Sequence, residues 1–116
     1  MIVTFVESLK FSDERETIFD GDEEFRILQL KLMDNPTCGD VIPGTNNVRK
    51  ARFRSAKQSK GTSGGIRLLY RYVPAQSRIY LIKAYRKNEM ENPSTAQLRA
   101  LRKLSDDEVS VSEAKP

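Results

Sequence analysis

Residues 64–85 read GGIRLLYRYVPAQSRIYLIKAY, two runs typical of β-strands separated by a short turn. In the first run, Ile66, Leu68 and Tyr70 alternate with Arg67 and Arg71. Alternation with a period of two, together with many aromatic and β-branched residues, predicts strands over residues 65–73 and 78–85. A connection this short predicts that the two strands pair in an antiparallel hairpin.

Outward from this hairpin, the preceding and following segments supply the rest of the fold. Residues 48–54, VRKARFR, predict another strand, and residues 2–7, IVTFVE, predict the first strand of the chain. The segment between residues 54 and 65 is rich in Ser and Gly, which predicts a loop. Residues 35–47 are dense in turn-forming residues and predict a connector.

Helical patterns occupy three further segments. A short helix is predicted to begin near Ser12 and to stop near Gly21, and a stronger helix follows over residues 22–34, ended by Pro36. Ser94 and Gln97 have the spacing of a capping box, which predicts a short C-terminal helix. The order β-α-α-β-β-β-α predicts an α+β fold, with the helices packed on one face of a small, mostly antiparallel twisted sheet.

The length of 116 residues predicts one domain, over residues 1–103. Residues 104–116 are polar and acidic, and their composition predicts a disordered C-terminal tail. No apolar run is long enough to span a bilayer, and the N-terminus lacks the pattern of a secretory signal, so we expect a cytoplasmic protein without a membrane partner.

Composition excludes several classes of enzyme. Histidine is absent, which rules out Ser-His-Asp and Cys-His nucleophilic sites and histidine-based zinc proteases. Cys38 is the only cysteine, so disulfide scaffolds and cysteine-rich zinc sites are also excluded. We expect no cofactor, and an enzyme of this composition has to work with Lys, Arg, Tyr, Asp or Glu.

Charge is distributed unevenly along the chain. Residues 1–47 carry a net charge of −6, residues 48–103 a net charge of +13, and residues 104–116 a net charge of −3. A segment with almost no acids indicates a surface for a polyanion such as RNA. The alternative is that these basic side chains only solvate the outer surface of the strands.

The alternation of the strands predicts where the basic side chains gather. If the apolar residues face the helices, a set of basic side chains shares the open face of the sheet and its rim. We expect this RNA- or ribosome-binding set to be Lys50, Arg52, Arg54, Lys57, Lys60 and Arg71, with Arg67 among them. Arg and Lys can stabilise charge at a reacting phosphate, but residue spacing alone leaves both cleavage and simple binding open.

Four blocks of the sequence resemble the RelE/HigB superfamily of toxins from type II toxin–antitoxin systems, and most resemble its HigB-like branch. These blocks are GDVIPGT at residues 39–45, VRKARF at 48–53, GGIRLLYRY at 64–72 and YRKNE at 85–89. The resemblance covers residues 2–103. Asn46 and Asn47 stand where many relatives have a Gly-Gly pair, which affects a turn and no catalytic position.

The resemblance implies a RelE-like microbial RNase fold and a metal-independent endoribonuclease that cuts mRNA on the ribosome. It implies that a cognate antitoxin, of the helix-turn-helix type, neutralises the protein and binds operator DNA with it. Arg67 matches the arginine that contacts the scissile phosphate, Lys87 a basic residue that stabilises charge or acts as an acid, and Tyr85 the tyrosine of the last block. The superfamily also contains gyrase poisons without an RNase site, but the basic set argues against that branch. The alternative function is a non-catalytic RNA- or ribosome-binding module, a degenerate toxin on the same fold.

Overall fold

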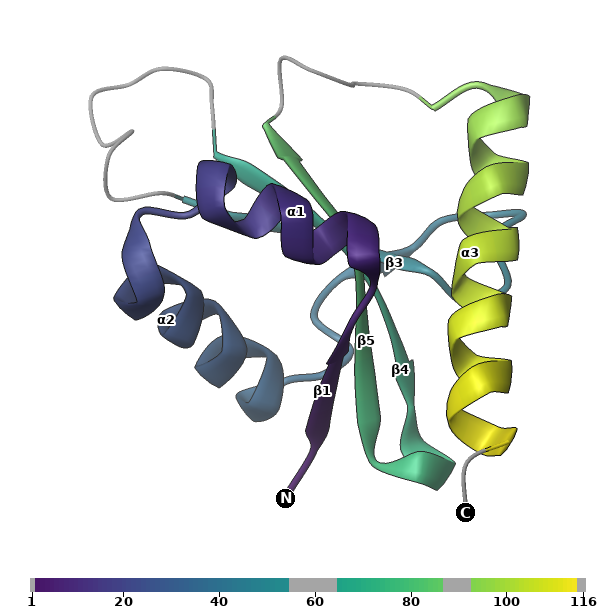
Figure 1. The fold of residues 1–116 in the computed structure, drawn as a ribbon, viewed down its shortest axis with the longest axis horizontal. Helices are drawn as coiled ribbons and strands as arrows, with labels where there is room; N and C mark the ends of the chain where they lie inside the picture. The colour runs from purple at the N-terminus through teal and green to yellow at the C-terminus, as the bar shows by residue number, and fades with distance from the viewer. Residues whose placement is uncertain (1, 55–64, 87–92, 115–116) are drawn as a thin grey trace.

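The computed structural model describes residues 2–54, 65–86 and 93–114. The elements follow the order β1 (Thr4–Glu7), α1 (Leu9–Ile18), α2 (Gly21–Asp34), β2 (Asp40–Val41), β3 (Arg49–Phe53), β4 (Ile66–Val73), the 3-10 turn η2 (Pro74–Gln76), β5 (Arg78–Arg86) and α3 (Thr95–Ala114) (Figure 1). The predicted mixed α+β class is confirmed. Within the described ranges, no helix is both long and apolar enough to cross a membrane.

The five strands form one sheet in the order β1-β5-β4-β3-β2. The hairpin of β4 and β5 supplies the centre, and β1 is added parallel to β5 while the other pairs are antiparallel. The strands predicted at residues 48–54, 65–73 and 78–85 therefore exist with nearly the predicted bounds. The two-residue strand β2 lies in the segment predicted to be only a connector.

Helix α1 begins earlier than the sequence pattern suggests. Ser8, not Ser12, is its N-cap: the Oγ of Ser8 accepts a hydrogen bond from the backbone N–H of Phe11 at 3.0 Å. The same hydroxyl donates to the carbonyl of Ile82 on β5 at 2.7 Å. Ser8 thus caps the helix and ties it to the sheet, a tertiary contact that local sequence does not reveal.

One face of the sheet packs against α1 and α2. Phe11, Phe25 and Leu32 from these helices are buried against Leu68 and Leu81 of the central strands. The rings of Phe11, Phe19 and Phe25 form a cluster with centroids 5.4 to 6.2 Å apart. Figure 1 shows both helices on the same side of the sheet.

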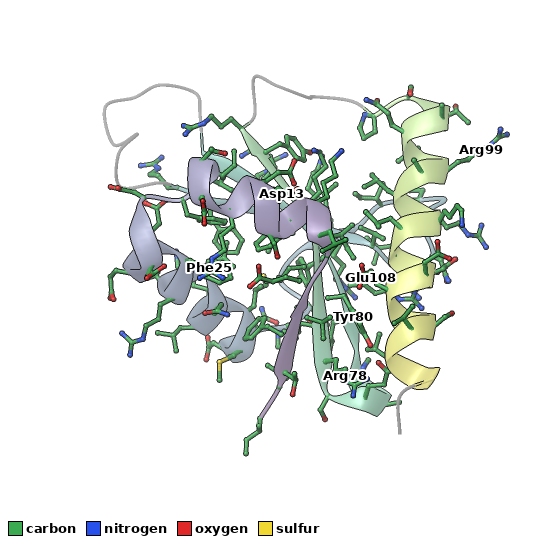
Figure 2. The ribbon with its side chains drawn as sticks, in the orientation of Figure 1. Asp13, Phe25, Arg78, Tyr80, Arg99 and Glu108 are labelled. Carbon is green, nitrogen blue, oxygen red and sulfur yellow. The ribbon has the colours of Figure 1, made fainter. Side chains whose placement is uncertain are left out.

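The opposite face is partly covered by α3, which corrects the prediction that all helices share one face (Figure 1). Leu101 and Val109 of α3 form a second core with Leu69, Tyr80 and Ile82. In Figure 2 the side chain of Arg99 extends from α3 away from the sheet, so the helix presents its apolar side inward. The prediction failed because a leucine-lined helix fits either face of a sheet, and its period does not say which one.

Helix α3 is also longer than predicted and runs through residues 104–114, where disorder was expected. Its start is the predicted capping box: Ser94 Oγ accepts from the N–H of Gln97 at 3.2 Å, and Gln97 Oε1 accepts from the N–H of Ser94 at 2.7 Å. The acids of the supposed tail support the helix, since Asp107 pairs with Lys103 one turn earlier at 2.9 Å. The boundary predicted after residue 103 falls inside this helix.

Candidate functional site

A row of polar and basic side chains crosses three strands on the face that carries α3. Arg67 on β4 lies directly opposite Arg52 on β3 and opposite Tyr85 on β5. Their neighbours Ala51 and Leu68 are buried in the core of α1 and α2, so the row points to the other side. Lys50, opposite Leu69, belongs to the same face. The structure thus places Lys50, Arg52 and Arg67 on one face, as the alternation of β3 and β4 predicts, and adds Tyr85 from β5.

Arg52 and Arg67 are like charges on directly opposed positions of an antiparallel pair. Such cross-strand pairs are destabilising. Arg52 is exposed and Arg67 is half-buried, so both can be reached from solvent. An arrangement of this kind favours an anion that bridges the two guanidinium groups.

Gly65, just before β4, packs against the backbone of Phe53 and the guanidinium of Arg67. Its φ of +73° lies in the left-handed region, and a Cβ built on it would be 3.0 Å from the carbonyl oxygen of Phe53 and 3.3 Å from Nη1 of Arg67. A larger residue would therefore be strained and would push against the guanidinium. Glycine at this position avoids both contacts.

Tyr85 is both a core residue and a neighbour of the basic row. It is only 2% exposed and packs in the second core with Leu69 and Leu101. Burial raises the pKa of the Tyr85 hydroxyl, and the charge of Arg67 opposes that rise in part. The hydroxyl therefore keeps its proton at neutral pH and can donate a hydrogen bond or a proton, but it is no general base.

Arg71 does not belong to the open basic surface, although the sequence predicts it there. Its Nη1 lies 2.7 Å from the Asp106 carboxylate on α3, and its side chain is 16% exposed. Asn46, in a left-handed turn with a φ of 56°, donates to the same carboxylate at 2.9 Å. Arg71 and Asn46 thus hold α3 on the sheet, and a glycine at position 46 could not make that bond.

Asp106 should make stability sensitive to acid. Desolvation works to raise its pKa, but hydrogen bonds from Asn46 and Arg71 and the nearby guanidinium charges outweigh it, so the pKa of Asp106 is lowered from 3.8. Because the folded-state pKa is lower, this contribution is present above the unfolded value and is lost as pH falls through the folded one. We expect Asp106→Asn to flatten the loss of unfolding free energy as the pH falls below about 4. Urea melts across that range test this, and parallel curves for the two proteins would contradict it.

The remaining predicted residues lie elsewhere. Arg54 lines a cavity on the α2 side of the sheet with Phe19, Asp20 and Glu23, so it is not part of the row formed by Arg52 and Arg67. Lys57, Lys60 and Lys87 lie outside the described residues. Among the described residues, no cluster of three metal-ligating side chains is present.

A largely buried ion pair, which the sequence did not predict, lies beside Tyr85. Nζ of Lys83 on β5 lies 2.6 Å from the carboxylate of Glu14 on α1, and that carboxylate also accepts from the N–H of Ala84 at 3.2 Å. Leu69 pairs with Lys83 and Tyr70 pairs with Leu81, so Ile82 is an extra residue in β5. As a result Lys83 and Tyr85 lie on the opposite face of the sheet from Ile79 and Leu81. This irregularity interrupts the period of two along β5, and no feature of the sequence indicates where it falls.

Comparisons with known proteins bear on the fold. A scan against models of known protein families finds no match. An arginine-to-alanine double mutant of the E. coli toxin RelE in the free state superposes with a TM-score of 0.56 at 16% identity, covering 78% of this chain and 90% of that one. The intact E. coli RelBE toxin–antitoxin complex matches with a TM-score of 0.52 at 15% identity, covering 72% of this chain and 94% of that one. The chain therefore has the fold of RelE.

Proposed function

We propose that this protein is the toxin of a type II toxin–antitoxin pair, of the HigB-like branch, and that it cleaves mRNA on the ribosome without a metal. The observation that carries the proposal is the register that sets Arg67 opposite both Arg52 and Tyr85 on one face. The RelE fold and the four sequence blocks support it. The proposed setting is the cytoplasm, where ribosomes and mRNA are available.

The chemistry follows from the residues in the row. The 2′-hydroxyl of a ribose gives its proton to water and forms a bond to the adjacent phosphorus, while the bond from phosphorus to the 5′-oxygen breaks and negative charge builds on the two non-bridging oxygens. The products are a 2′,3′-cyclic phosphate and a 5′-hydroxyl, whose oxygen takes up a proton. The fork of donors on Arg67 can hold these oxygens and strengthens its grip as the charge grows. Protonated Tyr85 lies beside Arg67 as a hydrogen-bond donor, and Lys87 is proposed, from the resemblance alone, to stabilise charge or to protonate the leaving oxygen.

The second candidate function is a non-catalytic RNA- or ribosome-binding module. The near-complete burial of Tyr85 favours it, because a residue with 2% exposure can serve packing alone. Induced expression in bacteria separates the two. A toxin arrests growth and shortens transcripts together, whereas a binding module leaves transcripts intact.

Binding to ribosomes or RNA should weaken steeply with salt. Residues 48–103 carry a net charge of +13, and each phosphate contact adds about 0.7 to the logarithmic salt slope for single strands. For Lys50, Arg52 and Arg67 acting together, we expect a slope of about −2 or steeper. Binding measured between low and moderate salt tests this, and a slope near zero would rule out the basic face as the contact surface.

We expect the antitoxin to mask the basic face with a segment rich in Asp and Glu, since complementary charge directs such contacts. The antitoxin is proposed to carry a helix-turn-helix, through which the pair binds operator DNA. Hydrogen exchange of the complex should show new protection in β3 and β4. Protection confined to residues 12–34 would instead place the antitoxin on the acidic helical side.

A further inference from the structure

A cavity of about 350 Å³ opens beside Tyr85, between α1, β5 and α3. One wall is apolar and comes from α3, with Ala100, Leu101 and Leu104. Polar groups from three elements complete it: Lys10 of α1, Lys83 of β5 and Gln97 of α3. The volume falls at the lower end of the range for small-molecule sites. Of these lining residues, only Tyr85 also belongs to the row with Arg52 and Arg67, so Tyr85 joins the cavity to the row.

The charges around the cavity select the kind of ligand. The ammonium of Lys83 is neutralised by the Glu14 carboxylate at 2.6 Å, and both side chains are about four-fifths buried, at 19% and 21% exposure. Lys10 is exposed and adds a second positive charge. Together, Lys10, Lys83 and Glu14 give this part of the cavity a net charge of +1. The cavity therefore suits a ligand with an apolar surface and a single negative charge.

A nucleotide within RNA has both features. Its phosphodiester carries one negative charge, and an unstacked base is bound on apolar or aromatic surfaces and read through hydrogen bonds at its edge. The Oε1 of Gln97 is bonded to the N–H of Ser94 in the capping box, so the amide NH₂ is the group that can donate to a base edge. The cavity also meets the row at Tyr85, whose cross-strand partner is Arg67.

We propose that this cavity holds the base of the nucleotide next to the scissile phosphate and that Gln97 reads its edge. The inference rests on the proposed function, since it assigns a base subsite to the same cleavage site. A partner-protein side chain with a carboxylate is the competing occupant. Two features favour the base: the amide of Gln97 lies on an apolar wall, and Tyr85 joins the cavity to its cross-strand partner Arg67. The test below separates the two occupants.

The test uses the free protein and the four nucleoside 2′,3′-cyclic monophosphates, which carry one negative charge each, in NMR titrations that follow the backbone amide shifts. We expect saturable shifts around Lys10, Gln97 and Leu101. Ala100→Phe fills the cavity from an exposed helix position and should weaken binding by at least about tenfold. Ala96→Phe places the same bulk on the same helix at an exposed residue outside the lining, and should bind as the wild type does. Gln97→Ala should reduce the difference in affinity among the four bases.

Several results would overturn the subsite. These are the absence of saturable shifts at the lining residues, equal affinity in both alanine-to-phenylalanine variants, or equal shifts with inorganic phosphate alone. Loss of antitoxin binding in Ala100→Phe with unchanged nucleotide affinity would assign the cavity to the partner protein. The proposed function fails separately: wild-type protein that never cuts mRNA on ribosomes refutes cleavage, whereas cutting with the same sites and rate in Ala100→Phe refutes only the subsite.

Discussion

Arg67→Ala should abolish growth arrest and slow ribosome-dependent mRNA cleavage by about 10²–10³-fold, because one charge-stabilising donor is lost at the transition state. The fold should survive, since Arg67 lies on the accessible side of β4 and its core-facing neighbours Ile66 and Leu68 are untouched. Removing one of two opposed arginines also relieves repulsion with Arg52. Stability should therefore stay the same or rise while activity falls.

Arg67→Lys should fail nearly as severely, because a point charge cannot make the two parallel bonds of a guanidinium. The matched control is Arg26→Ala, an arginine of α2 with a side chain 66% exposed and remote from the row in the fold. It should arrest growth as the wild type does. Single-turnover cleavage on purified ribosomes measures all three variants, and a wild-type rate in Arg67→Ala would remove Arg67 from the catalytic site.

Tyr70→Phe should lower the free energy of unfolding by about 1–3 kcal/mol. The Tyr70 hydroxyl donates to the carbonyl of Pro36 at 2.8 Å and accepts from the N–H of Gly39 at 2.9 Å. Burial raises the pKa of this hydroxyl, so it stays neutral and makes both bonds across the physiological range. Phenylalanine would leave two backbone groups of the connector without their partner, and the turn leading into β2 would loosen.

Urea unfolding measures the effect as a lower midpoint with an unchanged slope. Cys38→Ala is the control, because its Sγ is 3.8 Å from the same hydroxyl and the residue is exposed. It should change stability by less than about 0.5 kcal/mol. If Cys38→Ala lowered the free energy of unfolding as much as Tyr70→Phe does, the stabilising contact of the Tyr70 hydroxyl would be with the Cys38 thiol and not with the backbone.

Local patterns predicted the central elements of the fold and missed those set by tertiary contacts. β4 and β5 follow from alternation and a short turn, and the start of α3 follows from its capping box. The N-cap of α1 was missed because Ser8 is chosen by its second bond, to Ile82 across the sheet. The face that α3 covers is set by contacts of Leu101 and Val109 with residues distant in sequence, such as Leu69 and Ile82. The helical period predicts an apolar side of α3 but not the face of the sheet on which that side packs.

The site divides in the same way. Lys50, Arg52 and Arg67 share a face because alternate residues of a regular strand point to the same side of the sheet, and this can be predicted from the sequence. Arg71 points to the same face but forms an ion pair with Asp106. Asp106 lies in the part of α3 that the sequence did not predict to be helical. The Lys83–Glu14 pair and the cavity beside Tyr85 depend on a register shift and on three separate elements, so no local signal could reveal them.

The most direct test of the central claim is cleavage of one mRNA by the purified wild-type protein, with and without ribosomes. Mapping the ends of the products by primer extension locates each cut. The proposed function predicts cuts within codons of the ribosome-bound message, none in free mRNA, and no cuts from Arg67→Ala. Intact mRNA on ribosomes that nevertheless bind the protein would contradict cleavage and identify the basic face as a docking surface.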